Sequence, residues 1–197
     1  MQRVICAIAV CALSTVIAAA APPPLVVETD PHPPERQREL FRIPNGFEIQ
    51  LVASDPDIGQ PMNLNFDAAG RLWVTHSVEY PYPADSEGVE ARDDRFAGGG
   101  DHPPRDRLSV IEGIGPDGTP QRIVHFTEGL NIPIGQVPVP GGAIAYSIPS
   151  IRRYRDTDGD LQADESAVLY SGFGNVDTHG MVNSLTRWID GWIYACH

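Results

Sequence analysis

The sequence predicts an all-β fold and, more narrowly, an incomplete β-propeller of about three to four blades. From Phe41 onward, short apolar runs alternate with Gly, Pro, Asp and Asn turn residues, and no amphipathic helix is predicted among them. A weak internal repeat recurs along this region. Residues 41–197 are too few for a closed propeller of six blades, which needs at least about 240 residues. A small β-sandwich is the alternative fold.

The first 21 residues are typical of a secretory signal peptide. Arg3 is followed by an uncharged apolar run from Val4 to about Ala20, and then by small alanines and prolines, which predicts cleavage near Ala21. The run is marginal for a membrane-spanning helix. An uncleaved N-terminal anchor is therefore the alternative. In both cases we expect export to the periplasm or cell surface, with membrane association if the segment is retained.

Cysteine content and charge narrow the function classes. Cleavage would remove Cys6 and Cys11 and leave only Cys196, so no internal disulfide is expected. The formal net charge is −12, and all 14 basic residues are arginines, since the chain has no lysine. This acidity disfavours nucleic acid and anionic membranes as partners. It suits calcium, neutral substrates or cationic partners, although solubility alone would also explain it.

Residues 22–40 form a region rich in proline and charge, which predicts an extended linker before the propeller part at 41–197. Within that part, apolar runs bounded by turn residues predict individual strands. These strands cover residues 47–53, 71–76, 107–113, 121–127, 143–148, 151–156, 167–172 and 191–196.

The internal repeat consists of three stretches, "NFDAAGRLWV" (65–74), "VPGGAIAY" (139–146) and "WIDGWIYA" (188–195). Each reads as a strand end, a tight Asp/Gly or Gly turn and a second strand, which predicts three hairpins. The first unit carries a long polar insert over residues 79–106, of the kind that forms lids or mobile loops. Because the last strand ends the sequence without a capping segment, we expect the N-terminal piece of a longer protein.

The strongest local motif is the acidic loop "RDTDGDLQADES". Its carboxylates alternate with other residues, and such spacing lets several oxygens converge on one calcium ion. The loop departs from the EF-hand, because Leu161 replaces glycine at position 6 and Ala167 replaces glutamate at position 12. A solvated acidic turn is the alternative to a structural calcium site. The predicted calcium ligands are Asp156, Asp158, Asp160, Asp164 and the carbonyl of Gln162.

The stretch "DTHGMVNSL" contains the best candidate for chemistry, His179. It precedes the predicted strand pair 184–195, so its ring could point toward a central channel and accept a proton from a substrate hydroxyl. Asp177 is expected to orient it, and Asn183 to bind substrate or an ion. An ordinary turn histidine is the alternative.

Two further residues are expected to contribute to the same channel. His76 follows "RLWVT" and could line the same face. Asn131 is the polar member of "GLNIPIG" (129–135), which lies between two predicted strands and could shape the channel wall.

Several common sites are excluded by sequence. A c-type haem requires Cys-x-x-Cys-His, and Ile193 stands where the first cysteine would precede Cys196-His197. The chain also lacks a serine nucleophile elbow, a phosphate-binding glycine loop and an HExxH helix.

Taken in order, several motifs resemble one known family. They are "FEIQLVASDPDIGQPMNLNFDAAGRLWVTHSVEYP", "DRLSVIE", "GLNIPIG", "RDTDGDLQADE" and "THGMVNSLTRWIDGWIYACH", and together they cover about 41–197. They are similar to the N-terminal propeller of the exported membrane-bound dehydrogenase family of planctomycetes and related bacteria. That resemblance implies helical repeats and a C-terminal c-type cytochrome domain further along the chain, so haem c is expected only in a missing domain.

More distantly, "THGMVNSLTRWIDGWIY" resembles the soluble quinoprotein glucose/sorbosone dehydrogenases. In that family, a histidine before a strand and a Gly-Pro-Asp-Gly turn is the catalytic base beside pyrroloquinoline quinone. The resemblance maps this role onto His179. Trp188 and Ile189 depart from the turn, and the family's quinone-binding arginines and lysine cannot be placed here. The quinone is therefore implied by kinship alone.

Together these observations lead to one function hypothesis and one rival. The chain is expected to belong to a dehydrogenase that oxidises a sugar or other alcohol and passes electrons to a cytochrome c domain or another acceptor. The rival is a non-catalytic propeller that binds carbohydrate or protein ligands at the cell surface. The fragment alone is expected to be inactive, because an unclosed propeller has no complete channel.

Overall fold

The structure, a computed structural model, describes residues 30–84, 102–175 and 177–197. The predicted signal peptide at 1–21 and most of the insert at 79–106 lie outside the described residues. Residues 33–197 form one compact unit, and the description that follows concerns this unit. No helix in the described part is long and apolar enough to cross a membrane.

The predicted extended linker is interrupted by a short helix, α1 (Pro34–Leu40). Proline at the first helical turn has a backbone angle suited to the helix and needs no intrahelical hydrogen-bond donor there. Glu35 in the first turn and Arg38 in the last turn have the signs that the helix dipole favours. Arg36 and Glu39 also form an ion pair at 2.9 Å. The prediction of an extended chain is therefore wrong for residues 34–40.

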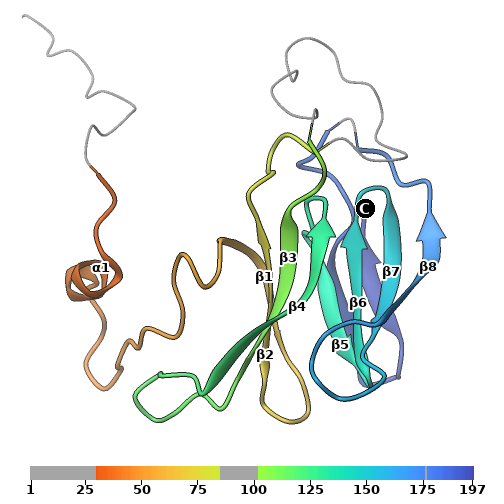
Figure 1. The fold of residues 1–197 in the computed structure, drawn as a ribbon. Coiled ribbons are helices and arrows are strands. Elements are labelled where there is room, and N and C mark those ends of the chain that lie inside the picture. Colours follow the sequence, from red (N-terminus) through yellow and green to blue (C-terminus); the bar gives the residue numbers. More distant parts are fainter. Residues whose placement is uncertain (1–29, 85–101, 176) are drawn as a thin grey trace, which may run out of the picture. The chain divides into compact units, whose positions relative to one another are not determined.

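Apart from α1, the described chain is built from strands, which confirms the predicted all-β class (Figure 1). Two antiparallel sheets have four strands each, in the orders β1-β2-β3-β4 and β5-β6-β7-β8, and β9 pairs with β10. Within the described residues none of these sheets closes on itself. The strands are β1 (Gln60–Phe66), β2 (Leu72–Ser77), β3 (Asp106–Glu112), β4 (Arg122–Leu130), β5 (Gln136–Val139), β6 (Gly142–Ser147), β7 (Ser150–Arg155), β8 (Glu165–Ser171), β9 (Asn183–Arg187) and β10 (Ile193–Cys196).

All three repeat stretches form hairpins, as predicted: β1–β2, β5–β6 and β9–β10. The first and third turns share their backbone hydrogen bonds. Asp67 N–H donates to the Arg71 carbonyl at 3.1 Å, and Trp188 N–H donates to the Trp192 carbonyl at 2.9 Å. The glycine in each turn has a positive φ, 78° at Gly70 and 89° at Gly191. Residues other than glycine are strained in that conformation. The repeated sequence pattern therefore reflects the backbone conformation that this type of turn requires.

The prediction of a strand at residues 47–53 is wrong, and the strands β1 and β5 were predicted only in part. Residues 47–53 alternate in the manner of a strand but pair with no other strand in the described part. The side chain of Gln50 instead donates to the carbonyl of Pro116. Only the ends of β1 and β5 were expected to be strands, because β1 contains Pro61 and asparagines, which have a low strand propensity. Pairing with β2 holds β1 extended despite that composition.

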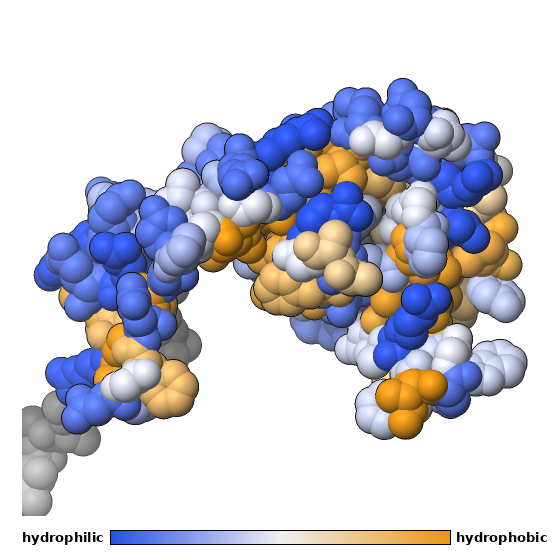
Figure 2. Space-filling model, turned by 90° about the horizontal axis from the view of Figure 1, so that it is seen from below, coloured by the Kyte–Doolittle hydropathy of each residue, from blue (hydrophilic) through white to orange (hydrophobic). Residues whose placement is uncertain are grey.

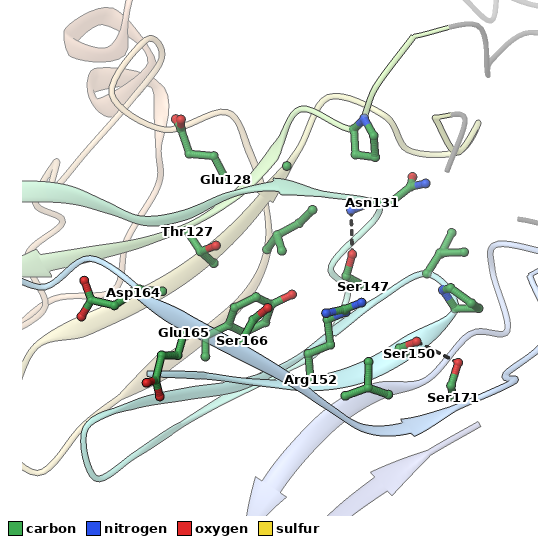
Figure 3. Close-up of a pocket in the computed structure, with 18 residues that line it drawn as sticks. Thr127, Glu128, Asn131, Ser147, Ser150, Arg152, Asp164, Glu165, Ser166 and Ser171 are labelled. Carbon is green, nitrogen blue, oxygen red and sulfur yellow. Dashed lines mark hydrogen bonds between the residues drawn. The ribbon is translucent and has the colours of Figure 1, made fainter. Parts of the chain in front are cut away.

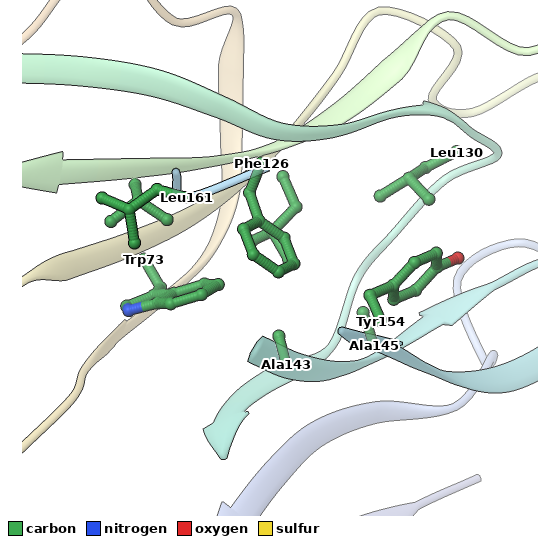
Figure 4. Close-up of a cluster of buried hydrophobic side chains, with 9 residues drawn as sticks. Trp73, Phe126, Leu130, Ala143, Ala145, Tyr154 and Leu161 are labelled. Carbon is green, nitrogen blue, oxygen red and sulfur yellow. The ribbon is translucent and has the colours of Figure 1, made fainter. Parts of the chain in front are cut away.

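A hydrophobic core joins the two four-stranded sheets (Figure 4). Trp73 and Phe126 lie on the first sheet with ring centroids 4.8 Å apart at 63°, an edge-to-face arrangement. Ala143 and Ala145 oppose them on the second sheet, and both are fully buried. The core members are Trp73, Leu108, Val110, Phe126, Leu130, Ala143, Ala145, Tyr154 and Leu161.

A second core joins the β5–β8 sheet to the β9–β10 hairpin. It contains side chains from β5, β6 and β9, together with residues of the loops that enter these strands. The β5–β8 sheet therefore packs against different neighbours with its two faces. The members are Ile132, Val137, Tyr146, Ile148, Met181, Val182 and Leu185.

Apolar side chains also reach the surface of the unit, where Figure 2 shows orange areas among hydrophilic ones. Leu64 and Phe66 of β1 are exposed, at 58% and 66%. Trp188, Ile189 and Trp192 are exposed around the β9–β10 turn. Large exposed apolar groups of this kind are typical of surfaces that another element covers.

Candidate functional site

His179 lies in a turn whose two sides are anchored in the protein. On the N-terminal side, the hydroxyl of buried Thr178 donates to the carbonyl of Pro81 at 2.9 Å. On the C-terminal side, Met181 and Val182 are fully buried in the second core. The histidine side chain itself is 69% exposed. The chain therefore holds an accessible imidazole between two fixed points.

Asp177 contacts this histidine in the predicted manner. One carboxylate oxygen of Asp177, Oδ1, lies 2.9 Å from both the backbone nitrogen and the ring Nδ1 of His179. Since a carboxylate accepts, Nδ1 carries the proton and Nε2 is left as the basic nitrogen of the neutral ring. The Tyr80 ring packs edge-on at 5.8 Å between centroids. This arrangement can take up a proton at Nε2.

The other two predicted channel residues, and Asn183, use their polar atoms within the protein. Asn131 is buried, and its amide donates to the carbonyl of Ala84 at 2.9 Å and accepts from the Ala84 N–H at 3.0 Å. Asn183 donates to the carbonyl of Met181 at 3.0 Å. His76 is buried in β2. The structure thus brings His179 and Asp177 together, and the substrate contacts of the other three stay predictions.

His76 belongs to a hydrogen-bonded row across β2, β3 and β4. Its Nδ1 accepts the Gly59 N–H at 2.9 Å, so the ring proton resides on Nε2, 2.8 Å from the Ser109 hydroxyl. Ser109 also contacts Nδ1 of His125 at 2.9 Å, and Arg107 donates to Nε2 of His125 at 3.2 Å. Burial lowers the pKa of His76 to about 4, and the nearby His125 and Arg107 act in the same direction. The row is therefore built around a neutral His76.

Asp106 was missed by sequence reasoning, yet it organises the loops at this end of the first sheet. It is 1% exposed, and its carboxylate accepts four hydrogen bonds. The donors are Ser77 Oγ and the backbone N–H groups of Val78, Glu79 and Ile132, at 2.7, 2.7, 3.2 and 2.8 Å. Burial raises the pKa of Asp106, and these donors offset part of that rise. In the sequence nothing separates Asp106 from the solvated acids of the insert, because its partners come from distant segments.

Three of the predicted calcium ligands converge in the β7–β8 loop. Asp156, Asp158 and Asp164 each place one carboxylate oxygen within 4.8 Å of the others. Asp160 binds within its own turn, where its carboxylate accepts from the backbone and side-chain nitrogens of Gln162, both at 2.7 Å. Hard oxygen donors at this spacing suit calcium. Three of the predicted side chains therefore converge, while the calcium ion and the contributions of Asp160 and Gln162 stay predictions.

Leu161, the residue that departs from the EF-hand pattern, is explained by packing. Its φ is 70°, the left-handed conformation that glycine supplies at this position. A leucine there costs about 1–2 kcal/mol of backbone strain. Its side chain is only 7% exposed and belongs to the core between the sheets, which offsets that cost.

A cleft of about 710 Å³ opens between β4 and the β7–β8 pair (Figure 3). Its lining is mostly polar and includes several hydroxyl groups, the single arginine Arg152 and the ring of Tyr154. Neither His179 nor Asp177 lines it. The candidate base and the cleft are therefore separate features of the molecule.

Comparison with known proteins gives one family match. The family described as "Domain of unknown function (DUF7133)" matches residues 33–197. No curated protein and no solved structure matches the chain.

Proposed function

Because the chain belongs to the DUF7133 family, whose description names no activity, we propose a function from its residues: it is the propeller part of an exported, quinoprotein-like dehydrogenase that oxidises a sugar or other alcohol. The observation that carries the proposal is the His179–Asp177 pair, with Nδ1 held at 2.9 Å from the carboxylate. This proposal also follows the resemblance to the planctomycete dehydrogenase family.

The arrangement of the sheets supports the propeller part of the proposal. Each four-stranded sheet follows chain order, as the blades of a propeller do. The first strands of successive sheets, β1, β5 and β9, are in contact, β5 lying against both others. The side chain of Asn65 in β1 donates to the carbonyl of Gln136 in β5 at 2.7 Å. On this proposal, β1, β5 and β9 are inner strands, and β9–β10 begins a third blade. A β-sandwich does not require this sequential contact.

His179 would act on the substrate hydroxyl through Nε2. In oxidation of an alcohol to a carbonyl, the hydroxyl proton goes to this nitrogen, and the electron pair leaves with the carbon-bound hydrogen to an acceptor. Asp177 keeps the basic nitrogen directed away from itself and stabilises the imidazolium that forms. A quinone, when bound, supplies the electron acceptor. The described residues offer no assignable quinone ligands.

Replacing His179 by alanine, in protein expressed from its complete reading frame, tests the proposal. We expect turnover of sugar or alcohol with an artificial electron acceptor and added quinone to fall at least about a hundredfold. Asp177→Asn should cost less, because the asparagine carbonyl can still accept a hydrogen bond from Nδ1 while the anionic partner of the ring is lost. The matched control is His32→Ala, which replaces an exposed histidine distant from His179 in the sequence. Unchanged turnover in His179→Ala would refute the base.

A structural calcium ion in the β7–β8 loop forms the second part of the proposal, supported by Asp156, Asp158 and Asp164. A ligand at a concentration a hundred times its Kd stabilises the folded state by about 2.7 kcal/mol. We therefore expect calcium to raise the melting temperature by several degrees relative to chelator. Asp158→Asn should remove most of this shift, while Asp117→Asn, in an exposed turn outside the loop, should keep it. Equal melting with calcium and chelator would leave only an acidic turn.

A non-catalytic binding propeller is the second candidate function. The observation that favours it is the exposure of His179, which lines no described cleft, whereas the cleft beside β4 is separate and polar. The two candidates differ in the turnover experiment, because a binding protein would have no activity for His179→Ala to remove.

A further inference from the structure

The acidic and basic side chains that line the cleft between β4 and the β7–β8 pair differ in whether they have partners within the protein (Figure 3). Two of its acids are neutralised by arginines outside the lining: Glu128 pairs with Arg107 at 2.9 Å, and Glu165 pairs with Arg155 at 2.9 Å. Asp164 accepts hydrogen bonds from the backbone and hydroxyl of Thr157, both at 2.7 Å. The acidic groups of the cleft thus already have partners within the protein.

Arg152 differs from these acidic groups, because its charge has no partner among the described residues. Among the described residues of the lining it is the only basic one, and within the described part of the chain its guanidinium makes no hydrogen bond or ion pair. The side chain is only partly exposed. A partly buried guanidinium without a carboxylate leaves planar, paired donors available, and these match a ligand carboxylate in bidentate geometry.

Hydroxyl groups surround this arginine. Ser147 lies in the same cleft, and Ser150 and Ser171 contact each other through their hydroxyls at 2.9 Å. Hydroxyls can both donate and accept, so they suit a ligand that is itself rich in hydroxyls. Tyr154 adds an aromatic group to the wall. A volume of about 710 Å³ lies within the range of small-molecule sites.

We propose that this cleft binds an acidic saccharide, a short sugar chain carrying one carboxylate, with the carboxylate on Arg152 and the sugar hydroxyls on the serines. A single charge is expected because the protein carries a formal net charge of −12, which repels a polyanion. The site does not depend on the dehydrogenase proposal, since it contains neither His179 nor Asp177.

Titration calorimetry at low salt tests the proposal with three probes: a trisaccharide ending in a uronic acid, the neutral trisaccharide of equal length, and inorganic phosphate. We expect the uronate ligand to bind at least about tenfold more tightly than the neutral one, the worth of one charge-assisted contact. Phosphate alone should bind more weakly than the uronate, because it lacks the hydroxyl contacts.

Substitutions locate the binding. Arg152→Gln should remove the preference for the uronate and leave the weak binding of the neutral sugar, and Arg152→Lys should recover only part of it because lysine lacks the planar fork. Arg187→Gln, in an exposed arginine of β9 outside the cleft, is the matched control and should bind as the wild type does. Melting curves of each variant establish that it is folded. Equal affinity for the uronate and neutral sugars, phosphate binding as tight as the uronate, or an unchanged preference in Arg152→Gln would each overturn the proposal.

Discussion

Replacing Asp106 by alanine is expected to lower the free energy of unfolding by about 3–5 kcal/mol, the cost of breaking a buried charged network. The carboxylate is buried and accepts four hydrogen bonds, three of them from backbone N–H groups. Alanine would leave buried donors without acceptors, and each such donor costs about 1–3 kcal/mol. Because Val78 and Ile132 lie in different loops, both loops should lose their anchor.

Urea unfolding measures this effect, as a lower midpoint at unchanged slope. Asp106→Asn should be intermediate, since its amide keeps one accepting oxygen and places a donor group where the other oxygen was. Asp117→Ala is the matched control, because Asp117 accepts only from Thr119 in an exposed turn and should change stability by less than about 1 kcal/mol. If Asp106→Ala lowered the free energy of unfolding by no more than this control does, the four hydrogen bonds of Asp106 would not stabilise the fold as proposed.

Acidification is expected to weaken the fold through His76. In the folded protein its pKa is about 4, below the ordinary 6.5 of the unfolded chain, so the unfolded state binds the proton more readily between these values. The contribution of His76 is therefore fully present above about pH 6.5 and is lost as the pH falls to about 4. The shift corresponds to about 3 kcal/mol. Protonation would also place a donor against the Gly59 N–H.

The difference in stability between wild type and His76→Asn isolates this group from the other titrating residues. Asparagine can still accept from Gly59 but does not titrate, so the variant should be less stable near neutral pH and lose less stability on acidification. The charged neighbours of the row, Arg107 and Glu128, are present in both proteins, as is His125. His32→Asn should follow the wild type. Parallel pH curves for wild type and His76→Asn would contradict the assignment.

Local features of the fold were predictable from the sequence, because their causes are local. The hairpin turns depend on an Asp/Gly turn in which Gly70 or Gly191 takes a positive φ, and these signals lie within a few residues. By contrast, residues 47–53 have the alternation of a strand but lack a strand partner, and β1 has a partner but a poor strand composition. Whether a neighbouring strand is present is decided by tertiary structure.

The residues of the candidate site also differ in whether the causes of their contacts are local in the sequence. The contact between Asp177 and His179 follows from a spacing of two residues, so the sequence alone could predict it. Asp106 depends on donors from two separate loops, and Arg152 matters because of the partners it lacks. Neither property is visible in a local pattern. A sequence scan can therefore find a turn that presents a histidine, but it cannot find the buried acid that holds loops together.

The position of Leu161 has a consequence for the neighbouring acidic loop. Its side chain is embedded between the sheets while its backbone N–H donates to Asp156 at 3.0 Å. A rearrangement of the loop that withdrew this side chain from the core would leave a cavity. The hydrophobic interior thus helps to hold the loop that carries the surface carboxylates. A cation arriving at this loop would meet ligands that are already ordered, so little conformational entropy would be lost on binding.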